Sequence, residues 1–369
     1  MGWDMHGGAT QTTTRRRVRR GARALLVALT VTAVGLAAGC SGGASPSPTK
    51  TVGGGVPTAD KSAPPKPEGP TVWPLTGVET EKVADRPALA VKIENSTDAR
   101  PQYGLEQADT VWEEVVEGGI TRFLAVFQSK TPARIEPIRS VRPMDAAVVA
   151  PLHGLFAFSG GQTPFVNAAK KVSQVITMDG GSPGFHRDPN RAAPHNVFAD
   201  TKDFFAQADK ARTTAPPPEQ FVFARSLAQS TAVTSGKAAR KATIHMSAAY
   251  VPGWTYDAGK KVYLRDERGV PSTSAEGARL SGANVVVLRV KVVNTKYKDP
   301  AGNPVPDTVL QGTGSATVLS GGKAVTGTWT KKSTGAVLRV TAGGKDILLA
   351  PGETWVELVP TGTGSVALG

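Results

Sequence analysis

Apolar runs divide the first half of the chain into short strands and helices. The segments that predict strands are 88–93, 110–116, 121–128 and 155–159. The segments that predict helices are 144–154, 164–172 and 200–210. Because Gly118-Gly119 separates the second strand from the third, we expect a hairpin there, and Thr201 is the expected cap of the last helix. This mixture predicts an α/β domain over residues 72–225.

In the second half of the chain, hydrophobic residues recur with the period of β-strands, and few segments have the period of a helix. A β-branched run at 284–293 is followed by shorter alternating segments at 316–319, 325–329, 337–340 and 355–359. Gly321-Gly322 predicts a tight turn between two of them. Residues 243–368 therefore predict a mainly β domain, a small barrel or a sandwich. The expected fold class is α+β, with the mixed α/β domain first and the mainly β domain second.

The first 39 residues have the layout of an export signal. Six arginines precede an apolar run at 24–36, and small residues lead to Cys40. The run is shorter than the roughly 20 residues of a spanning helix. The segment before Cys40 resembles the lipobox of bacterial lipoproteins, in which the cysteine is diacylated. A simple secretory signal is the alternative, and the general or the twin-arginine export route stays open. Residues 40–71 then read as a lipidated cysteine and a disordered tether rich in Ser, Gly and Pro.

The charge and the cysteine content limit the classes of partner and of metal site that the protein can have. The formal charge is +13, and removal of residues 1–39, with six Arg and one Asp, leaves +8. Cys40 is the only cysteine, so a disulfide framework or a thiolate metal site is excluded. A basic protein at the outer face of the cell membrane favours anionic polymers or an envelope protein, and nucleic acid is not an expected partner. We expect no cofactor.

Three polar clusters carry the candidate chemistry. The first contains Glu114 and Glu117, which could act as acid or base if burial raised their pKa values. On a strand, Glu114 and its neighbour Glu113 point to opposite faces. The alternative is an ordinary turn in which a solvated glutamate contacts Arg122.

The second cluster holds Arg139 and Arg142 around Ser140, just before a predicted helix. Guanidinium groups close to a helix N-terminus suit a carboxylate or phosphate ligand. Internal pairing with Glu114 or Asp145 is the alternative.

The third cluster is a polar loop after several glycines. It holds His186, Asp188, Arg191, His195 and Asn196. His195 could be a general base oriented by Asn196 or Asp188, and the two histidines with Asp188 could hold a divalent metal. Their spacing matches no standard metal signature, and we predict no metal. A hydrogen-bonded loop anchor is the structural alternative.

Several segments together resemble the YerB-like bacterial lipoproteins. They are Trp73–Gly77, Arg100–Gln102, Val116–Arg122, Pro137–Pro143, Ala193–Asn196, Asn284–Val287 and Gly352–Trp355. The chain departs from the expected pattern at Glu136, where we expect glycine. The resemblance implies an envelope lipoprotein with two domains of unknown function, and it implies that the three clusters form one site. It does not supply a reaction.

The leading hypothesis is a lipid-anchored protein that binds an anionic envelope component or a protein partner. Arg122, Arg139 and Arg142 would hold charge, and His195 with Asn196 would give hydrogen-bond specificity. The alternative is an envelope hydrolase or transferase in which Glu114 or Glu117 is the acid and His195 the base.

Overall fold

The computed structural model describes residues 69–369. Strands dominate and helices are few and short, which confirms the expected α+β class with a β-rich second half. The predicted signal peptide, the predicted lipidation site Cys40 and most of the predicted tether lie outside the described residues. Across the described part, no helix combines the length and the apolar character needed to cross a membrane.

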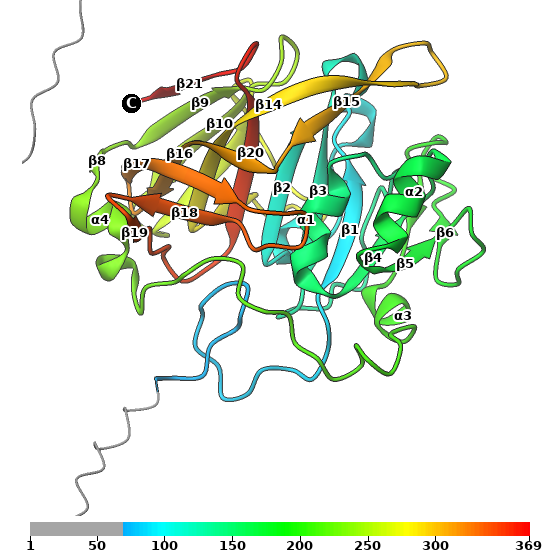
Figure 1. The fold of residues 1–369 in the computed structure, drawn as a ribbon, viewed down its shortest axis with the longest axis horizontal. Coiled ribbons are helices and arrows are strands. Elements are labelled where there is room, and N and C mark those ends of the chain that lie inside the picture. The colour runs from blue at the N-terminus through cyan, green and yellow to red at the C-terminus, as the bar shows by residue number, and fades with distance from the viewer. Residues whose placement is uncertain (1–68) are drawn as a thin grey trace, which may run out of the picture. The chain divides into compact units, whose positions relative to one another are not determined.

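The first half contributes one side of a large sheet (Figure 1). Its strands are β1 (Leu89–Glu94), β2 (Thr110–Val115), β3 (Thr121–Phe127), β4 (Leu155–Phe158) and β5 (Gln174–Thr177). β2 and β3 form the predicted antiparallel hairpin, turning through Gly118 and Gly119, whose φ angles of 67° and 73° favour glycine. β1 pairs with β3 antiparallel and with β4 parallel, and β4 pairs with β5 parallel.

The second half extends the same sheet. Its strands are β14 (Asn284–Lys298), β15 (Pro304–Val309), β16 (Gly312–Ser320), β17 (Lys323–Lys331), β18 (Arg339–Ala342), β19 (Lys345–Asp346) and β20 (Thr354–Pro360). β20 pairs in parallel with β14 on one side and with β2 on the other. The two halves are therefore joined by a continuous hydrogen-bonded sheet. The short β8 (Lys237–Ala238) pairs with β17.

A smaller sheet packs on one face of this large sheet. It consists of β9 (Lys241–His245), β10 (Pro252–Asp257), β11 (Val262–Glu267), β12 (Val270–Pro271), β13 (Ser281–Gly282) and β21 (Ser365–Leu368). Trp355 of the large sheet lies edge-on to Trp254 at 5.3 Å and to Phe123 at 5.5 Å between ring centroids. Trp254 and Tyr263 are thus buried in the core.

Short helices cover the opposite face. α1 (Asp145–Val149) continues as a 3-10 turn at Ala150–Leu152, and α2 (Thr163–Lys170) follows. Their apolar residues pack on Leu124 and Phe156 of the sheet. The remaining elements are α3 (Thr201–Phe205), α4 (Thr231–Ser235), the hairpin of β6 (His186–Arg187) and β7 (Val197–Phe198), and 3-10 turns at Thr97–Ala99, Leu105–Gln107, Glu117–Gly119 and Leu227–Gln229.

The helices are shorter than their patterns predict. Asp200, not Thr201, caps α3, because its carboxylate accepts a hydrogen bond from the backbone N–H of Lys202 at 2.8 Å. The Thr201 hydroxyl instead donates to the carbonyl oxygen of Pro132. α1 tightens into a 3-10 turn at Pro151, which lacks the N–H that an α-helix needs.

Candidate functional site

The ends of β1, β2 and β3 bring charged residues into one row. Glu94 of β1 lies in register with Arg122 of β3, and Arg122 lies in register with Glu114 of β2. Side chains at alternate positions of a strand share a face, so Lys92 and Glu94 both point to the helix-covered face. This face therefore collects charges from three neighbouring strands.

Lys92, Glu114 and Asp145 form a fully buried ionic cluster. The ammonium of Lys92 bonds to the carboxylate of Glu114 and, at 2.8 Å, to Oδ1 of Asp145. Asp145 begins α1, and its Oδ2 accepts a hydrogen bond from the backbone N–H of Arg142 at 2.6 Å. Burial raises the pKa of Glu114 to about 8, helped by the nearby Asp145 and opposed by Lys92. We therefore expect Glu114 to be mostly protonated at neutral pH.

Three arginines surround the backbone of Ser140. Nη1 of Arg122 donates to the Ser140 carbonyl oxygen at 3.0 Å, and Nη1 of Arg142 approaches the same oxygen at 3.4 Å. Arg142 also pairs with Glu117, with 2.7 Å between Nε and Oε1. Burial and the charges of Arg142 and Arg139 lower the pKa of Arg122 to about 9. In the second predicted cluster, Arg142 thus pairs with Glu117 through its side chain, and Arg139 pairs with Glu94.

Glu94 connects the arginines to the polar loop. Its Oε2 lies 2.9 Å from Nδ1 of His195 and 3.1 Å from Nε of Arg139, while its Oε1 accepts a hydrogen bond from the Ser96 hydroxyl at 2.9 Å. Nη1 of Arg139 also donates to the carbonyl oxygen of Pro194 at 3.3 Å. His195 and Arg139 therefore share one carboxylate, and Arg122 lies beside Glu94 in the register of the strands.

The other loop residues have structural partners. Asp188 bonds to Arg134, and its pKa is lowered by a backbone hydrogen bond from Asn190 and by Arg134. Asn196 bridges the hairpin by donating to the Asp188 carbonyl oxygen at 3.2 Å and accepting from Arg187 at 2.8 Å.

The two remaining candidate residues of this loop, His186 and Arg191, contact neighbouring segments. His186 packs on Phe198, with 5.3 Å between ring centroids, and Arg191 donates to the carbonyl oxygens of Ala99 and Pro101. Within residues 69–369, no three His, Cys, Asp or Glu side chains converge as metal ligands. His186 thus lies apart from the charged row, whereas His195 belongs to it.

Sequence reasoning missed Lys92 and Glu94 as members of this site, and it named Asp145 only as a possible partner of the arginines. A signal for two of them exists, since Lys92 and Glu94 interrupt an otherwise apolar strand at alternate positions, and a buried strand rarely contains charge without a partner. The residues that pair with them are set by the order of the strands in the sheet. The local sequence does not determine that order.

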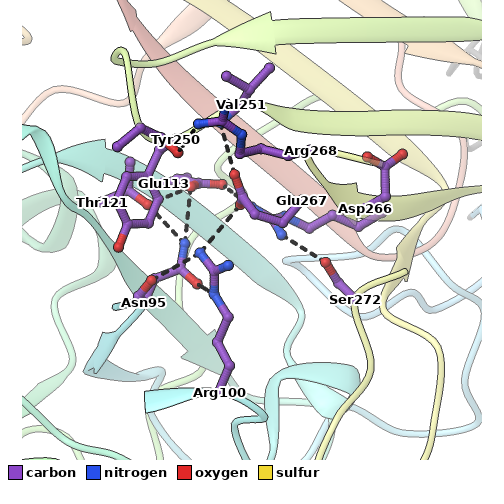
Figure 2. Close-up of polar contacts among 12 residues, drawn as sticks. Asn95, Arg100, Glu113, Thr121, Tyr250, Val251, Asp266, Glu267, Arg268 and Ser272 are labelled. Carbon is purple, nitrogen blue, oxygen red and sulfur yellow. Dashed lines mark hydrogen bonds and ion pairs between the residues drawn. The ribbon is translucent and has the colours of Figure 1, made fainter. Parts of the chain in front are cut away.

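A second polar network lies on the opposite face of the same strands (Figure 2). Glu113 accepts hydrogen bonds from the Thr121 hydroxyl at 2.7 Å and from Nη2 of Arg265 at 2.8 Å. Arg265 also bonds to Glu267 at 3.0 Å, and Glu267 lies 3.4 Å from Nη2 of Arg100. This network joins β1–β3 to the smaller sheet.

Comparison with known proteins places the chain in a family. Two family models match it, the N-terminal domain of a protein of unknown function (DUF3048) at residues 75–214 and the C-terminal domain of the same family at 242–356. The chain is 28% identical over 294 residues to a Bacillus subtilis protein named "Putative lipoprotein YerB", covering 78% of this chain and 86% of that protein.

The fold is also that of a solved structure. The crystal structure of YerB from Bacillus subtilis superposes with a TM-score of 0.69 at 24% identity, covering 80% of this chain and 99% of that chain. The family models, the sequence relative and the shared fold agree with one another and with the resemblance in the sequence motifs. The chain belongs to the YerB-like family, whose two domains (DUF3048) have no known function.

Proposed function

We propose that this protein is anchored by lipid at Cys40 to the outer face of the cell membrane, where it binds an anionic envelope component. The binding site is the arginine cluster, defined as Arg122, Arg139 and Arg142. His195 at its edge supplies hydrogen-bond specificity. The ligand carries phosphate or carboxylate groups, because guanidinium forks match the geometry of both.

The proposal rests on guanidinium N–H groups that make no hydrogen bond within the described residues. Within residues 69–369, the Nη2 atoms of Arg122, Arg139 and Arg142 make no hydrogen bond, and none of the three is sealed from solvent. Their Nε or Nη1 atoms are meanwhile fixed by Glu94, Glu117 or backbone carbonyls. The arginines are thus held in place while part of each fork remains available to a ligand.

The charge balance favours an anion. Three guanidinium groups face two carboxylates, Glu94 and Glu117, which leaves one positive charge in excess. Arg122 contributes most to this excess, since it is 8% exposed and its bond within the described residues goes to a carbonyl oxygen rather than a carboxylate. A ligand anion would compensate a partly desolvated charge, and such charge-assisted hydrogen bonds are among the stronger ones.

The geometry favours binding over hydrolysis. A general acid must reach its substrate, yet Glu114 is fully buried and paired with Lys92. Glu117 is 6% exposed and engaged with Arg142, and Nδ1 of His195 is engaged with Glu94. The hydrolase or transferase alternative would require these contacts to be broken before catalysis.

Cell fractionation tests the anchor. The wild-type protein should sediment with membranes, whereas Cys40→Ser should leave the membrane fraction because loss of two acyl chains removes stable anchoring. Ser41→Ala is the matched control and should remain with membranes. Membrane retention of Cys40→Ser would refute the lipid anchor without bearing on the arginine cluster.

Titration calorimetry tests the site. Poly(glycerol phosphate) and phosphatidylglycerol vesicles serve as separate probes, so that a polymer ligand is distinguished from a lipid headgroup. Arg139→Gln should weaken binding of the preferred probe by about tenfold or more. Arg339→Gln removes an equal charge from the distant strand β18 and should change binding little. Equal affinities for the wild type and both variants, or no binding of either probe, would refute the proposal.

A further inference from the structure

A cavity lies beside the second polar network, on the face of the large sheet opposite the arginine cluster. Its volume is about 450 Å³, and it lies between the end of β1 and strands β11 and β12 of the smaller sheet. Small-molecule sites commonly have volumes of about 300–1,000 Å³. The cavity is therefore large enough for a small organic ligand.

One part of the cavity wall is apolar. Phe123 and Leu280 line it from the buried core, where they are 1% and 2% exposed. Val270 of β12 lines it at the surface and is 67% exposed, the highest value among the large hydrophobic side chains exposed within residues 69–369. A ligand with an apolar body would cover Val270 while contacting Phe123 and Leu280, and burial of that surface favours binding.

The other part of the wall is cationic. Arg100, Arg265 and Arg268 line the cavity with one carboxylate, Glu267. Arg265 is held in the core through Nη1 by Ser272 and through Nη2 by Glu113 and Glu267. Arg100 is held through Nε and Nη2 by the side chain and backbone of Asn95 (Figure 2).

Two of these arginines keep donors for a ligand. Within the described residues, Nη1 of Arg100 makes no hydrogen bond and is not sealed from solvent. Arg268 is fixed through Nη1, which donates to the carbonyl oxygens of Ala248 and Ala249 at 3.3 Å, and its Nη2 makes no hydrogen bond there. Arg100 and Arg268 therefore bring available donors to the same cavity from the two halves of the chain, beside the carboxylate of Glu267, which lies 3.4 Å from Nη2 of Arg100.

We propose that this cavity binds a small amphipathic carboxylate, a ligand with one anionic head and an apolar tail. The head pairs with Arg100 and Arg268, and the tail packs on Phe123, Leu280 and Val270. This site is independent of the arginine cluster, because it opens on the other face of the sheet and uses none of the same side chains.

Calorimetry with three probes tests the site in the full-length protein. Decanoate carries both features of the proposed ligand, decan-1-ol has the tail without the charge, and acetate has the charge without the tail. Decanoate should bind at least about tenfold more tightly than either partial probe, since charge pairing and apolar burial each contribute.

Two variants test the charged contact and the apolar contact separately. Arg268→Gln should weaken the binding of decanoate by about tenfold or more and leave the binding of decan-1-ol unchanged. Val270→Ser should weaken both, because it removes only apolar contact. Arg339→Gln is the control for charge and should have no effect on either probe.

Three results would overturn the proposal. They are the absence of decanoate binding, equal binding of decanoate and decan-1-ol, and binding that is lost in Arg139→Gln but kept in Arg268→Gln. The last result would place the carboxylate in the arginine cluster instead. Circular dichroism of each variant verifies that the fold is intact, so a lost signal cannot come from unfolding.

Discussion

The buried cluster of Lys92, Glu114 and Asp145 predicts a specific pH dependence of stability. Burial raises the pKa of Glu114 from an ordinary 4.5 to about 8, so the folded protein binds a proton that the unfolded chain releases. The stabilisation from this proton is complete below about pH 4.5 and is lost as the pH rises through about 8. The free energy of unfolding should therefore fall with rising pH across this interval.

The substitution Glu114→Gln isolates this contribution. Glutamine keeps the size of the side chain and an oxygen that can accept from Lys92, but it cannot ionise. One proton bound only by the folded state changes the free energy of unfolding by about 1.4 kcal/mol per pH unit. Between about pH 5.5 and about pH 7.5, the variant should therefore gain about 2 to 3 kcal/mol relative to the wild type.

Urea denaturation at several pH values, followed by tryptophan fluorescence, measures this difference. The comparison must be between variant and wild type, because burial also raises the pKa values of Glu353 and Glu357 and gives them the same sign of dependence. Asp85→Asn is the control, since Asp85 is 59% exposed in its side chain and pairs with Lys82 at the surface. A Glu114→Gln variant with the same pH slope as the wild type would mean that Glu114 is ionised in the folded protein, and the reasoning would fail.

Three further substitutions test the packing of the fold by denaturant unfolding. Lys92→Met leaves two buried carboxyl groups without their ammonium and should cost about 3–5 kcal/mol, part of which Asp145→Asn should restore in the double variant. Gly154→Ala places a methyl group against the backbone carbonyl just before β1 and should cost about 1–3 kcal/mol, whereas Gly335→Ala meets open space and should be nearly neutral. Asn284→Ala removes a fully buried amide that bonds β14 to backbone and side chains near β20, and a loss below about 1 kcal/mol would contradict that assignment.

Local pattern predicted most elements of the large sheet. Strands β1, β2, β3, β14 and β20 each arise from an apolar run that is continuous or alternating, because both faces of this sheet are covered. The smaller sheet was not predicted strand by strand. β10 contains Gly253 and several polar residues, and β12 and β13 have two residues each, so their periods are too short to detect.

The residues of the candidate site were harder to predict than the elements that hold them. The arginines and His195 stood out because several polar residues occur close together in loops. Glu94 and Lys92 gave a weaker signal inside an apolar strand, and their partners come from segments that are distant in sequence. Such pairings depend on strand order and on the path of the loop, which a single sequence does not specify.

Three pairs of neighbouring residues explain why two polar sites lie back to back. Glu94 ends β1 and Asn95 follows it, Glu113 and Glu114 lie in β2, and Thr121 and Arg122 begin β3. Adjacent strand residues point to opposite faces, so one member of each pair supplies the arginine cluster or the Lys92 cluster, and the other supplies the network beside the cavity.

This arrangement determines how the two sites can be separated by mutation. A backbone change at the end of β1, such as a proline, would shift Glu94 and Asn95 together and disturb both faces. A side-chain change at Arg139 or Arg268, which lie outside the three strands, leaves the shared backbone in place. Loss of both binding activities in either of these single variants would therefore show that the two faces act as one site rather than two.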